Sequence, residues 1–389
     1  RGQYYLHNFL ASQPDLNFHN PAVQQAVLEV MRFWLERGVD GFRLDTVNYY
    51  FHDARLRSNP PNRVRNEHLP YAVNPYDMQE HRFSKSQPEN LDFLRRVRTL
   101  LDEFPGTTSV GEVGDSHKSV QLMAQYTSGG DTLHMCYDFL GDEFTAAHFR
   151  SRIEQFFKAG PDGWPCWSFS NHDVPRHLTR WAPFGQSPAE LARQAAALVL
   201  SLKGSVCLYQ GEELGLPETD LLFEELTDPR GIRFWPEDRG RDGCRTPIPW
   251  EEGPAPNGFT AGTPWLPLKP AQSALSVASQ QADASSTLAF YRTILAWRKA
   301  QPALRAGDIV FHKTAEPVLA FRRTLGDLAM LCVFNLSAEP QALAVSGLAS
   351  ATLEAVSQHA TLGGQTLQLG ANGYAFIAVP AGKRVSLRS

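Results

Sequence analysis

The sequence predicts an α/β fold in which a parallel sheet with crossover helices is followed by an antiparallel β domain. Amphipathic helices alternate with short apolar segments from residue 20 to about residue 300, and polar residues stand where these segments end. Near residue 308 the pattern changes to short alternating runs separated by turn residues. The first part is therefore predicted to be a (β/α) barrel, which places its chemistry at the carboxyl ends of its strands.

The first predicted helix begins at Asn20 and Pro21. A capping residue, a first-turn proline, an apolar stripe and a closing Gly38 follow in the order that a helix requires. The helix runs into GVDGFRLD, residues 38–45, a short apolar segment typical of a buried strand. Because side chains alternate along a strand, Arg43 and Asp45 are expected to point to the same side, toward the barrel axis.

The same alternation recurs along the chain. Residues 88–104 and 187–202 carry apolar stripes at helical spacing, and Gly204 closes the second of these helices. Together with residues 38–45, four more segments are predicted to be strands of one sheet: residues 107–113, 132–139, 166–170 and 205–210.

Two long polar insertions, residues 49–87 and 215–265, interrupt this pattern. Long loops on the carboxyl face of a barrel usually form walls or lids of a site. A helix over residues 286–300 precedes the change of pattern, and the short runs from about Asp308 onward predict the antiparallel β domain.

Composition and charge narrow the class of partner. The chain has 389 residues and a formal net charge of −4, which argues against a nucleic-acid partner or a polybasic membrane surface. No run of about 18 apolar residues is present to cross a membrane. The eight tryptophans suit stacking on sugars as well as core packing. Small neutral partners are expected.

Cysteine usage indicates a reducing compartment. The five cysteines are odd in number and show no CxxC or other paired spacing, so they are predicted to be free thiols with no metal site. A cytoplasmic location is expected, and a periplasmic one stays open. The sequence opens with RGQYYLHNF and no methionine, which is expected of a fragment.

Three predicted strands end in acids: Asp45 in FRLD, Glu112 in SVGEV and Asp173 in SFSNHD. Any one of them could be a capping or salt-bridged carboxylate, but three at equivalent points of successive strands indicate a site. The guanidinium of Arg43 favours the ionised form of Asp45, which could then act as a nucleophile; a structural salt bridge is the alternative. Glu112 lies between glycines with apolar neighbours and no adjacent base, so it is expected to stay protonated as a general acid.

Two carboxyl groups held in opposite protonation states are what glycoside cleavage requires. His172 and Asp173 could hold sugar hydroxyls, as imidazole donor and bidentate acceptor. Metal ligation by His172, Asp173, Asp45 and Glu112 stays an alternative, although the HxxxH or HxH spacing of a metal site is missing. QGEELG lacks the lysine of a phosphate-binding loop.

These residues occur in blocks that resemble the α-amylase superfamily, glycoside hydrolase family 13, and more narrowly its bacterial α-glucosidase and oligo-1,6-glucosidase group. Six blocks in the right order make the resemblance specific. They are QPDLN (13–17), GFRLDTVN (41–48), GEVG (111–114), SNHD (170–173), YQGEELG (209–215) and GRDGCRTPIPW (240–250).

The resemblance implies a role for each matching residue. Asp45 would be the nucleophile, Glu112 the acid/base, and Asp173 the third carboxylate, which holds the 2- and 3-hydroxyls of the sugar. Arg43 and His172 would line the same glucose subsite, which Arg241 would close from the far side. The residue after the nucleophile is Thr46, and in this group threonine or alanine goes with α-1,4 links and valine with α-1,6 links.

The resemblance also implies a domain organisation. Residues 1–19 would end an inserted domain B, residues 20–304 would supply strands four to eight of a (β/α)8 TIM barrel, and residues 305–389 would form a C-terminal β-sandwich domain. The first three barrel strands and an Asn-His block of the family are not in this sequence, so an N-terminal barrel segment is an expected partner. A family calcium or magnesium ion, where one occurs, lies in that segment, so no cofactor is expected here.

The function implied is that of a retaining, exo-acting α-glucosidase that cleaves short oligosaccharides such as maltose and can transfer glucosyl groups to alcohols. Two alternatives stay open: a sucrose- or trehalose-type relative that transfers or isomerises, and a catalytically incompetent fragment. A non-catalytic relative, such as the ectodomain of an amino-acid transporter heavy chain, is disfavoured because all three acids are present.

Overall fold

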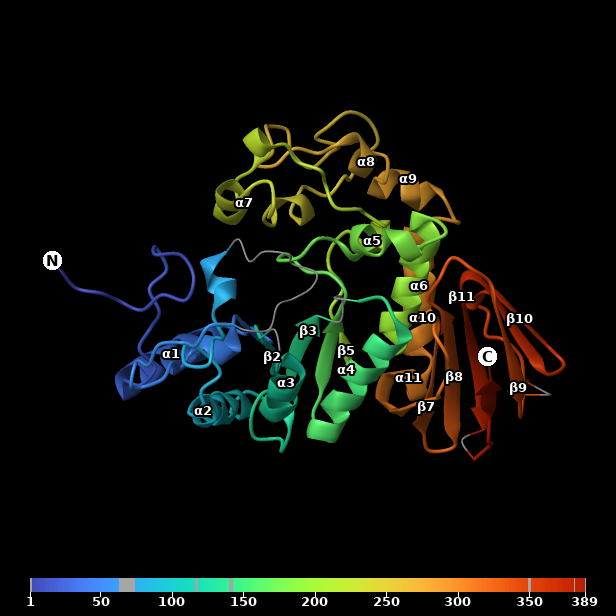
Figure 1. Ribbon diagram of the computed structural model, residues 1–389, viewed down its shortest axis with the longest axis horizontal. Coiled ribbons are helices and arrows are strands. Elements are labelled where there is room, and N and C mark those ends of the chain that lie inside the picture. Colours follow the sequence, from blue (N-terminus) through green and yellow to red (C-terminus); the bar gives the residue numbers. More distant parts are fainter. Residues whose placement is uncertain are drawn as a thin grey trace. The chain divides into compact units, whose positions relative to one another are not determined.

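The computed structural model describes residues 2–62, 74–115, 118–139, 143–348, 351–380 and 382–388 of the chain. The chain divides into two compact units. The first consists of Arg1–Asp138 and Ile153–Cys166, and the second of Phe139–Arg152 and Trp167–Ser389. Figure 1 shows the helices and strands of both units.

Short strands form one five-stranded sheet in the described part of the chain, in the order β1-β2-β3-β4-β5. β1 and β2 pair in parallel, with Gly41 opposite Thr108, and β2 pairs in parallel with β3. A Cβ atom on Gly41 would lie 2.0 Å from the Thr108 carbonyl oxygen, so only glycine allows this close approach. The structure confirms the five predicted strands at shorter lengths: β1 Gly41–Leu44, β2 Thr108–Glu112, β3 Met135–Phe139, β4 Pro165–Ser168 and β5 Ser205–Val206.

The helix before β1 and the helix before β2 form as predicted. α1 (Pro21–Leu35) is capped by Asn20, whose side chain accepts a hydrogen bond from the Ala22 N–H, and α2 spans Asn90–Asp102. Their buried faces share one core cluster, against which Phe42 and Leu44 of β1 also pack. Because side chains alternate along a strand, Arg43 points to the opposite face of the sheet.

Two crossover helices were not predicted. α3 (Ser119–Thr127) follows β2, and α4 (Ala146–Ala159) follows β3, as parallel pairing requires. The apolar side chains of α4 stand three and four residues apart, at Phe149, Ile153 and Phe156, and each is fully buried. This spacing was a usable helix signal that the sequence analysis missed.

The second unit contains most of the remaining helices. α6 (Pro188–Ser201) is capped by Ser187 and α10 spans Thr287–Lys299, both within the predicted ranges. Five short helices also belong to this unit, and one of them, α7, lies in the insertion at 215–265. They are α5 His177–Arg180, α7 Pro229–Phe234, α8 Pro270–Ser273, α9 Val277–Ala282 and α11 Pro302–Ala306.

The antiparallel β domain is confirmed. In the described part it is one seven-stranded sheet in the order β12-β9-β11-β8-β7-β6, with β10 paired to β11. Alternate residues of its strands face one apolar core cluster, in which Val333 and Ile377 are fully buried. The strands are β6 Asp308–Phe311, β7 Val318–Leu325, β8 Leu328–Asn335, β9 Gln341–Ser346, β10 Gln358–Gly363, β11 Thr366–Pro380 and β12 Ser386–Arg388.

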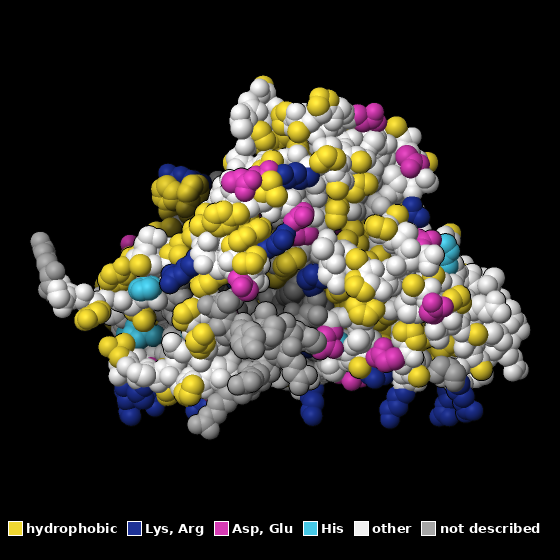
Figure 2. Space-filling view, turned by 45° about the horizontal axis from the view of Figure 1, so that its top comes forward, with side chains coloured by type: hydrophobic (Ala, Val, Ile, Leu, Met, Phe, Trp, Pro, Cys, Tyr) yellow, Lys and Arg dark blue, Asp and Glu magenta, His cyan; other side chains and the backbone are white. Residues whose placement is uncertain are grey.

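The surface and the cysteines are those of an ordinary globular chain. On the face shown in Figure 2, apolar side chains lie among charged and polar ones. None of the five cysteines, which all lie among the described residues, forms a disulfide, and all but Cys207 are buried. Among the residues described, none of the helices has the length and apolar character needed to cross a membrane.

Candidate active site

One guanidinium contacts two of the predicted carboxylates. Arg43 on β1 forms an ion pair with Asp45 through Nη1, and its Nη2 lies 2.7 Å from Oε2 of Glu112, the last residue of β2. Burial lowers the pKa of Arg43, but the charges of Glu112 and Asp45 outweigh it and hold that pKa above its usual value. Arg43 is therefore a permanent positive charge shared by the two acids.

The turn after β1 is folded back onto Glu112. Thr46 has a φ of 41°, the left-handed conformation, which a β-branched residue rarely adopts. Its backbone N–H donates a hydrogen bond of 3.2 Å to Glu112 Oε2, and Tyr137 donates one of 3.3 Å to Glu112 Oε1. The unfavourable backbone conformation thus coincides with a contact that fixes the second acid.

The prediction of an apolar environment around Glu112 is wrong. Apolar neighbours and no adjacent base were expected from the sequence, but Arg43 lies within ion-pair distance. The reason is strand register: parallel pairing sets Arg43 opposite Val110, two residues before Glu112 on the same face. Asp45 is 70% exposed and Glu112 only 15%, so a ligand has freer access to Asp45.

The insertion after β1 is tied to the loop after β2. Asn48 is fully buried, donates to the Gly114 carbonyl at 3.1 Å and accepts from the Gly114 N–H at 3.0 Å. Lys85 donates to the same carbonyl at 2.8 Å and to the Tyr49 hydroxyl at 3.0 Å. Asn48, Tyr49 and Lys85 were not predicted from the sequence. An asparagine that follows a buried apolar strand was the available signal for Asn48.

In the second unit, three predicted residues meet around one carboxylate. Asp173, in the loop after β4, accepts a hydrogen bond of 3.1 Å from Arg241 Nη1, and its other oxygen lies 3.2 Å from His172 Nε2. A further cation, Arg245, donates to the same oxygen as Arg241 at 2.9 Å. Asp173 is about a third exposed, so its acceptor oxygens remain within reach of a ligand.

Arg241 is itself held by a buried acid. Its Nε and Nη2 donate to the two oxygens of Asp228 at 2.9 and 3.1 Å, a bidentate pair. This hydrogen bonding raises the pKa of Arg241 in spite of burial. Burial alone would raise the pKa of Asp228, but the bonds from Arg241 and from backbone N–H groups hold it below its usual value. Arg241 therefore presents a fixed charge to Asp173.

Two more arginines complete this region, and the sequence analysis predicted neither. Arg245 stands four residues after Arg241, across a single 3-10 turn, and its Nε donates to the His172 carbonyl at 2.7 Å. Arg176 is buried and donates to the Gln210 carbonyl at 2.9 Å and to the Cys244 carbonyl at 3.1 Å. Arg176 thus holds the backbone of the turn that carries Arg241 and Arg245.

Three titratable residues lie next to Arg176: His177 and Glu212 are buried, and Glu218 is half-buried. Burial lowers the pKa of His177 to about 3 and raises that of Glu212 to about 8 and that of Glu218 to about 7. Near pH 7, His177 and Glu212 are therefore uncharged, and the 3.9 Å between them is not an ion pair. Glu218 accepts a 2.7 Å hydrogen bond from the Arg176 N–H.

The structure therefore places the predicted site residues in two groups: Arg43, Asp45, Thr46 and Glu112 in the first unit, and His172, Asp173 and Arg241 in the second. Within the described ranges, no cluster of three or more His, Cys, Asp or Glu side chains is arranged to hold a metal ion.

Residues 1–307 match the protein family described as alpha amylase, catalytic domain. The chain is 53% identical over 345 residues to a probable alpha-glucosidase of Rhizobium meliloti (strain 1021), an alignment covering 87% of this chain and 62% of that protein. It is 28% identical over 376 residues to the oligo-1,6-glucosidase of Parageobacillus thermoglucosidasius, covering 86% of this chain and 64% of that protein.

A solved structure is also similar. The crystal structure of the alpha-glucosyl transfer enzyme XgtA matches with a TM-score of 0.90 and 49% sequence identity, over 96% of this chain and 70% of that one. The fold of the chain is therefore the one found in that enzyme. The chain spans about three fifths of the length of the curated relatives that it matches.

Proposed function

Because this chain belongs to the alpha-amylase catalytic-domain family, we propose that the protein containing it is a retaining, exo-acting α-glucosidase. Its substrates are short oligosaccharides such as maltose, cleaved at the terminal α-glucosidic bond, and alcohols can replace water as the acceptor. One observation carries the proposal: Arg43 contacts both Asp45 and Glu112 at the ends of two paired parallel strands.

In the first step, Asp45 attacks the anomeric carbon of the terminal glucose. The glycosidic C–O bond breaks, its electron pair goes to the leaving oxygen, and Glu112 donates a proton to that oxygen. The product is a covalent glucosyl-enzyme ester on Asp45. The greater exposure of Asp45 supports its assignment as the nucleophile, because the nucleophile must reach carbon itself.

In the second step, Glu112 removes a proton from water or from an alcohol, whose oxygen attacks the anomeric carbon and releases Asp45. Each step inverts the configuration at the anomeric carbon, so the two steps together retain it. Arg43 balances the negative charge on whichever acid is ionised: Asp45 before the first step, and Glu112 after it has given up its proton. A cation that contacts both acids can serve both steps without moving far.

Asp173 is proposed as the third carboxylate, which accepts hydrogen bonds from sugar hydroxyls. Arg241 and Arg245 both contact Oδ1 of Asp173 and hold the carboxylate in place, and its two oxygens can accept further hydrogen bonds from a sugar. His172 would donate to the same sugar or orient Asp173. Sugar hydroxyls are neutral donors, so an ionised acceptor gains a charge-assisted hydrogen bond from them.

The relatives support the two halves of the proposal. Hydrolysis is supported by the 53% identity to a probable alpha-glucosidase, and glucosyl transfer by the similarity to an alpha-glucosyl transfer enzyme. Maltose incubated with a simple alcohol should give both free glucose and an α-glucoside of that alcohol. The ratio of the two products measures the balance between hydrolysis and transfer.

The test uses the whole protein and a nitrophenyl α-glucoside. Asp45→Asn and Glu112→Gln should each abolish turnover, whereas Asp40→Asn, an exposed aspartate just before β1, should leave it unchanged. NMR of the sugar first released should show the α anomer. Turnover surviving in either active-site variant, or release of the β anomer, would show that the proposal is wrong.

A further inference from the structure

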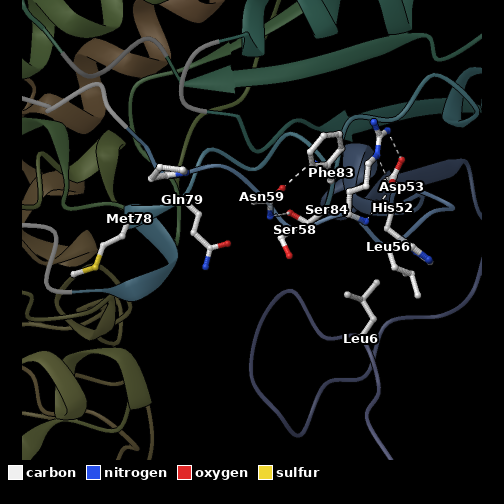
Figure 3. Close-up of a pocket in the computed structure, with 12 residues that line it drawn as sticks. Leu6, His52, Asp53, Leu56, Ser58, Asn59, Met78, Gln79, Phe83 and Ser84 are labelled. Carbon is white, nitrogen blue, oxygen red and sulfur yellow. Dashed lines mark hydrogen bonds and ion pairs between the residues drawn. The ribbon is translucent and has the colours of Figure 1, made fainter.

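A cavity of about 620 Å³ lies within the first unit, in the insertion that follows β1. Its volume falls in the range of roughly 300 to 1,000 Å³ that is usual for small-molecule sites. Arg43, Asp45 and Glu112 are not among its lining residues. Figure 3 shows Ser58 and Gln79 on one side of the opening and Leu6, from the N-terminal segment, facing them.

The frame of the cavity is fixed by hydrogen bonds within the insertion. Arg57 pairs with Asp53 through two bonds, of 2.6 and 3.1 Å, and lies 4.2 Å from the centre of the Phe83 ring. Asn59 accepts from the Phe83 N–H at 2.8 Å and donates to the Ser84 hydroxyl at 3.2 Å. These contacts hold the wall in shape before any ligand arrives.

Three polar side chains that line the cavity have hydrogen-bonding groups available for a ligand. The side chains of His52, Ser58 and Gln79 make no hydrogen bond with any part of the chain that the structure describes. An amide, a hydroxyl and a neutral imidazole each offer both a donor and an acceptor. Burial lowers the pKa of His52, which favours the neutral ring.

The charges at the cavity cancel. The hydrogen bonds from Arg57 hold the pKa of Asp53 at about 2, so the two residues form an ion pair with no net charge. The remaining wall includes apolar side chains, among them Leu6, Met78 and Phe83. A ligand that suits this lining is uncharged, has hydroxyl groups on its edges and presents aliphatic C–H groups between them.

We infer that this cavity is a second carbohydrate site, which binds a short neutral oligosaccharide through Gln79, Ser58 and His52. The amide and hydroxyl groups exchange hydrogen bonds with sugar hydroxyls, and Phe83 and Met78 pack against the C–H faces of the rings. The inference concerns binding alone and does not depend on the catalytic roles proposed for Asp45 and Glu112.

Met78 provides a local reporter. Its side chain lines the cavity and is 52% exposed, whereas Met31, Met123 and Met330 are buried elsewhere. The whole protein would be labelled with ¹³C-methyl methionine in an Asp45→Asn background, so that no sugar is turned over, and titrated with maltotriose. Met78→Leu identifies the resonance. We expect a saturable shift of the Met78 methyl signal, with the three buried methionines unmoved.

Two variants test the residues named. Gln79→Ala and Ser58→Ala should each raise the dissociation constant for maltotriose, measured from the shift of the Met78 signal, by about fivefold to tenfold, because each removes one hydrogen bond. Gln121→Ala, an exposed glutamine on α3, is the matched control and should leave the response unchanged. Unmoved signals of the buried methionines in the free variants show that each is folded. Both Ser58 and Gln79 are exposed, so neither substitution disturbs a core.

The inference is overturned if the Met78 signal does not shift with maltotriose, or if the shift persists unchanged in both variants. It is also overturned if glucose 6-phosphate binds more tightly than maltotriose, because the site would then select an anion. Turnover of a nitrophenyl glucoside is measured separately, so failure at this cavity leaves the proposed glucosidase activity untouched.

Discussion

Nη2 of Arg43 lies 2.7 Å from the Glu112 carboxylate, while Nη1 of the same guanidinium contacts Asp45. A planar, forked cation can hold two separate carboxylates at once, whereas an ammonium group is a single point charge. The charge at position 43 alone therefore does not account for this arrangement; the shape of the guanidinium does.

Arg43→Lys should lower kcat for a nitrophenyl α-glucoside by about 10²-fold to 10³-fold, the usual effect of removing one preorganised charge-stabilising donor. The positive charge is kept, so the loss reports geometry. Arg55→Lys, at an exposed position in the same insertion, is the control. Activity within a few-fold of the unmodified protein would contradict the bridging role.

Thr46→Val should raise the ratio of kcat/KM for isomaltose over maltose. The substitution keeps a β-branched residue at the left-handed position and removes a hydroxyl for which the structure gives no capping hydrogen bond. The specificity change would therefore come from the surface presented to the sugar and leave the backbone as it is. An unchanged ratio would remove Thr46 from the proposed specificity determinants.

Asp228→Asn should raise KM more than it lowers kcat. The asparagine cannot form a bidentate ion pair with Arg241, so the guanidinium loses its fixed position beside Asp173. A hydrogen bond to a charged group contributes about 1.5 to 3 kcal/mol, so the unfolding midpoint should also fall. Asp220→Asn, which alters an exposed ion pair with Arg239, is the comparison and should change neither quantity appreciably. Equal behaviour of the two variants would count against the proposed role of Asp228.

The stability of the chain should decrease between pH 6.5 and pH 8. Folded Glu212, with its pKa raised by burial to about 8, keeps a proton that the unfolded chain releases above about pH 4.5, so stability is lost as the pH rises. Burial lowers the pKa of His177 to about 3, so this residue makes stability rise with pH between pH 3 and 6.5. Below pH 6.5, the contributions of Glu212 and His177 to the free energy of unfolding change in opposite directions as the pH rises. Above pH 6.5 only the loss due to Glu212 continues, and Glu218, with its pKa raised to about 7, adds to that loss up to about pH 7.

Glu212→Gln should flatten this decrease, since the amide mimics the protonated acid and does not titrate. Titration of one group changes the free energy of unfolding by at most about 1.4 kcal/mol per pH unit, and the substitution removes this contribution. Chemical unfolding at pH 6.5 and pH 8 measures the slope, with the exposed Glu224→Gln as control. A slope that is the same in Glu212→Gln and in the unmodified chain would show that Glu212 is not the group responsible.

Much of the local structure follows from residues close together in the sequence. The Asn20 cap, the proline at position 21 and the apolar stripe placed α1 correctly, and the short apolar runs located all five strands of the parallel sheet. The missed helix α4 carried its signal in the spacing of Phe149, Ile153 and Phe156. Helix periodicity, capping and strand alternation depend on neighbouring residues, so they can be read without the fold.

By itself, the sequence determined that Asp45 and Glu112 stand at the ends of two neighbouring strands, that Arg43 and Asp45 share a side, and which family the motif blocks resemble. The prediction that Asp173 also ends a strand is wrong, because β4 stops at Ser168 and the chain is already in a loop at Asp173. Only the tertiary structure decided that Glu112 shares the guanidinium of Arg43, that Arg245 joins Arg241 at Asp173, and that Glu212 and His177 are buried uncharged. The physical reason is that strand register, hydrogen bonding between distant segments and desolvation are created when those segments pack together.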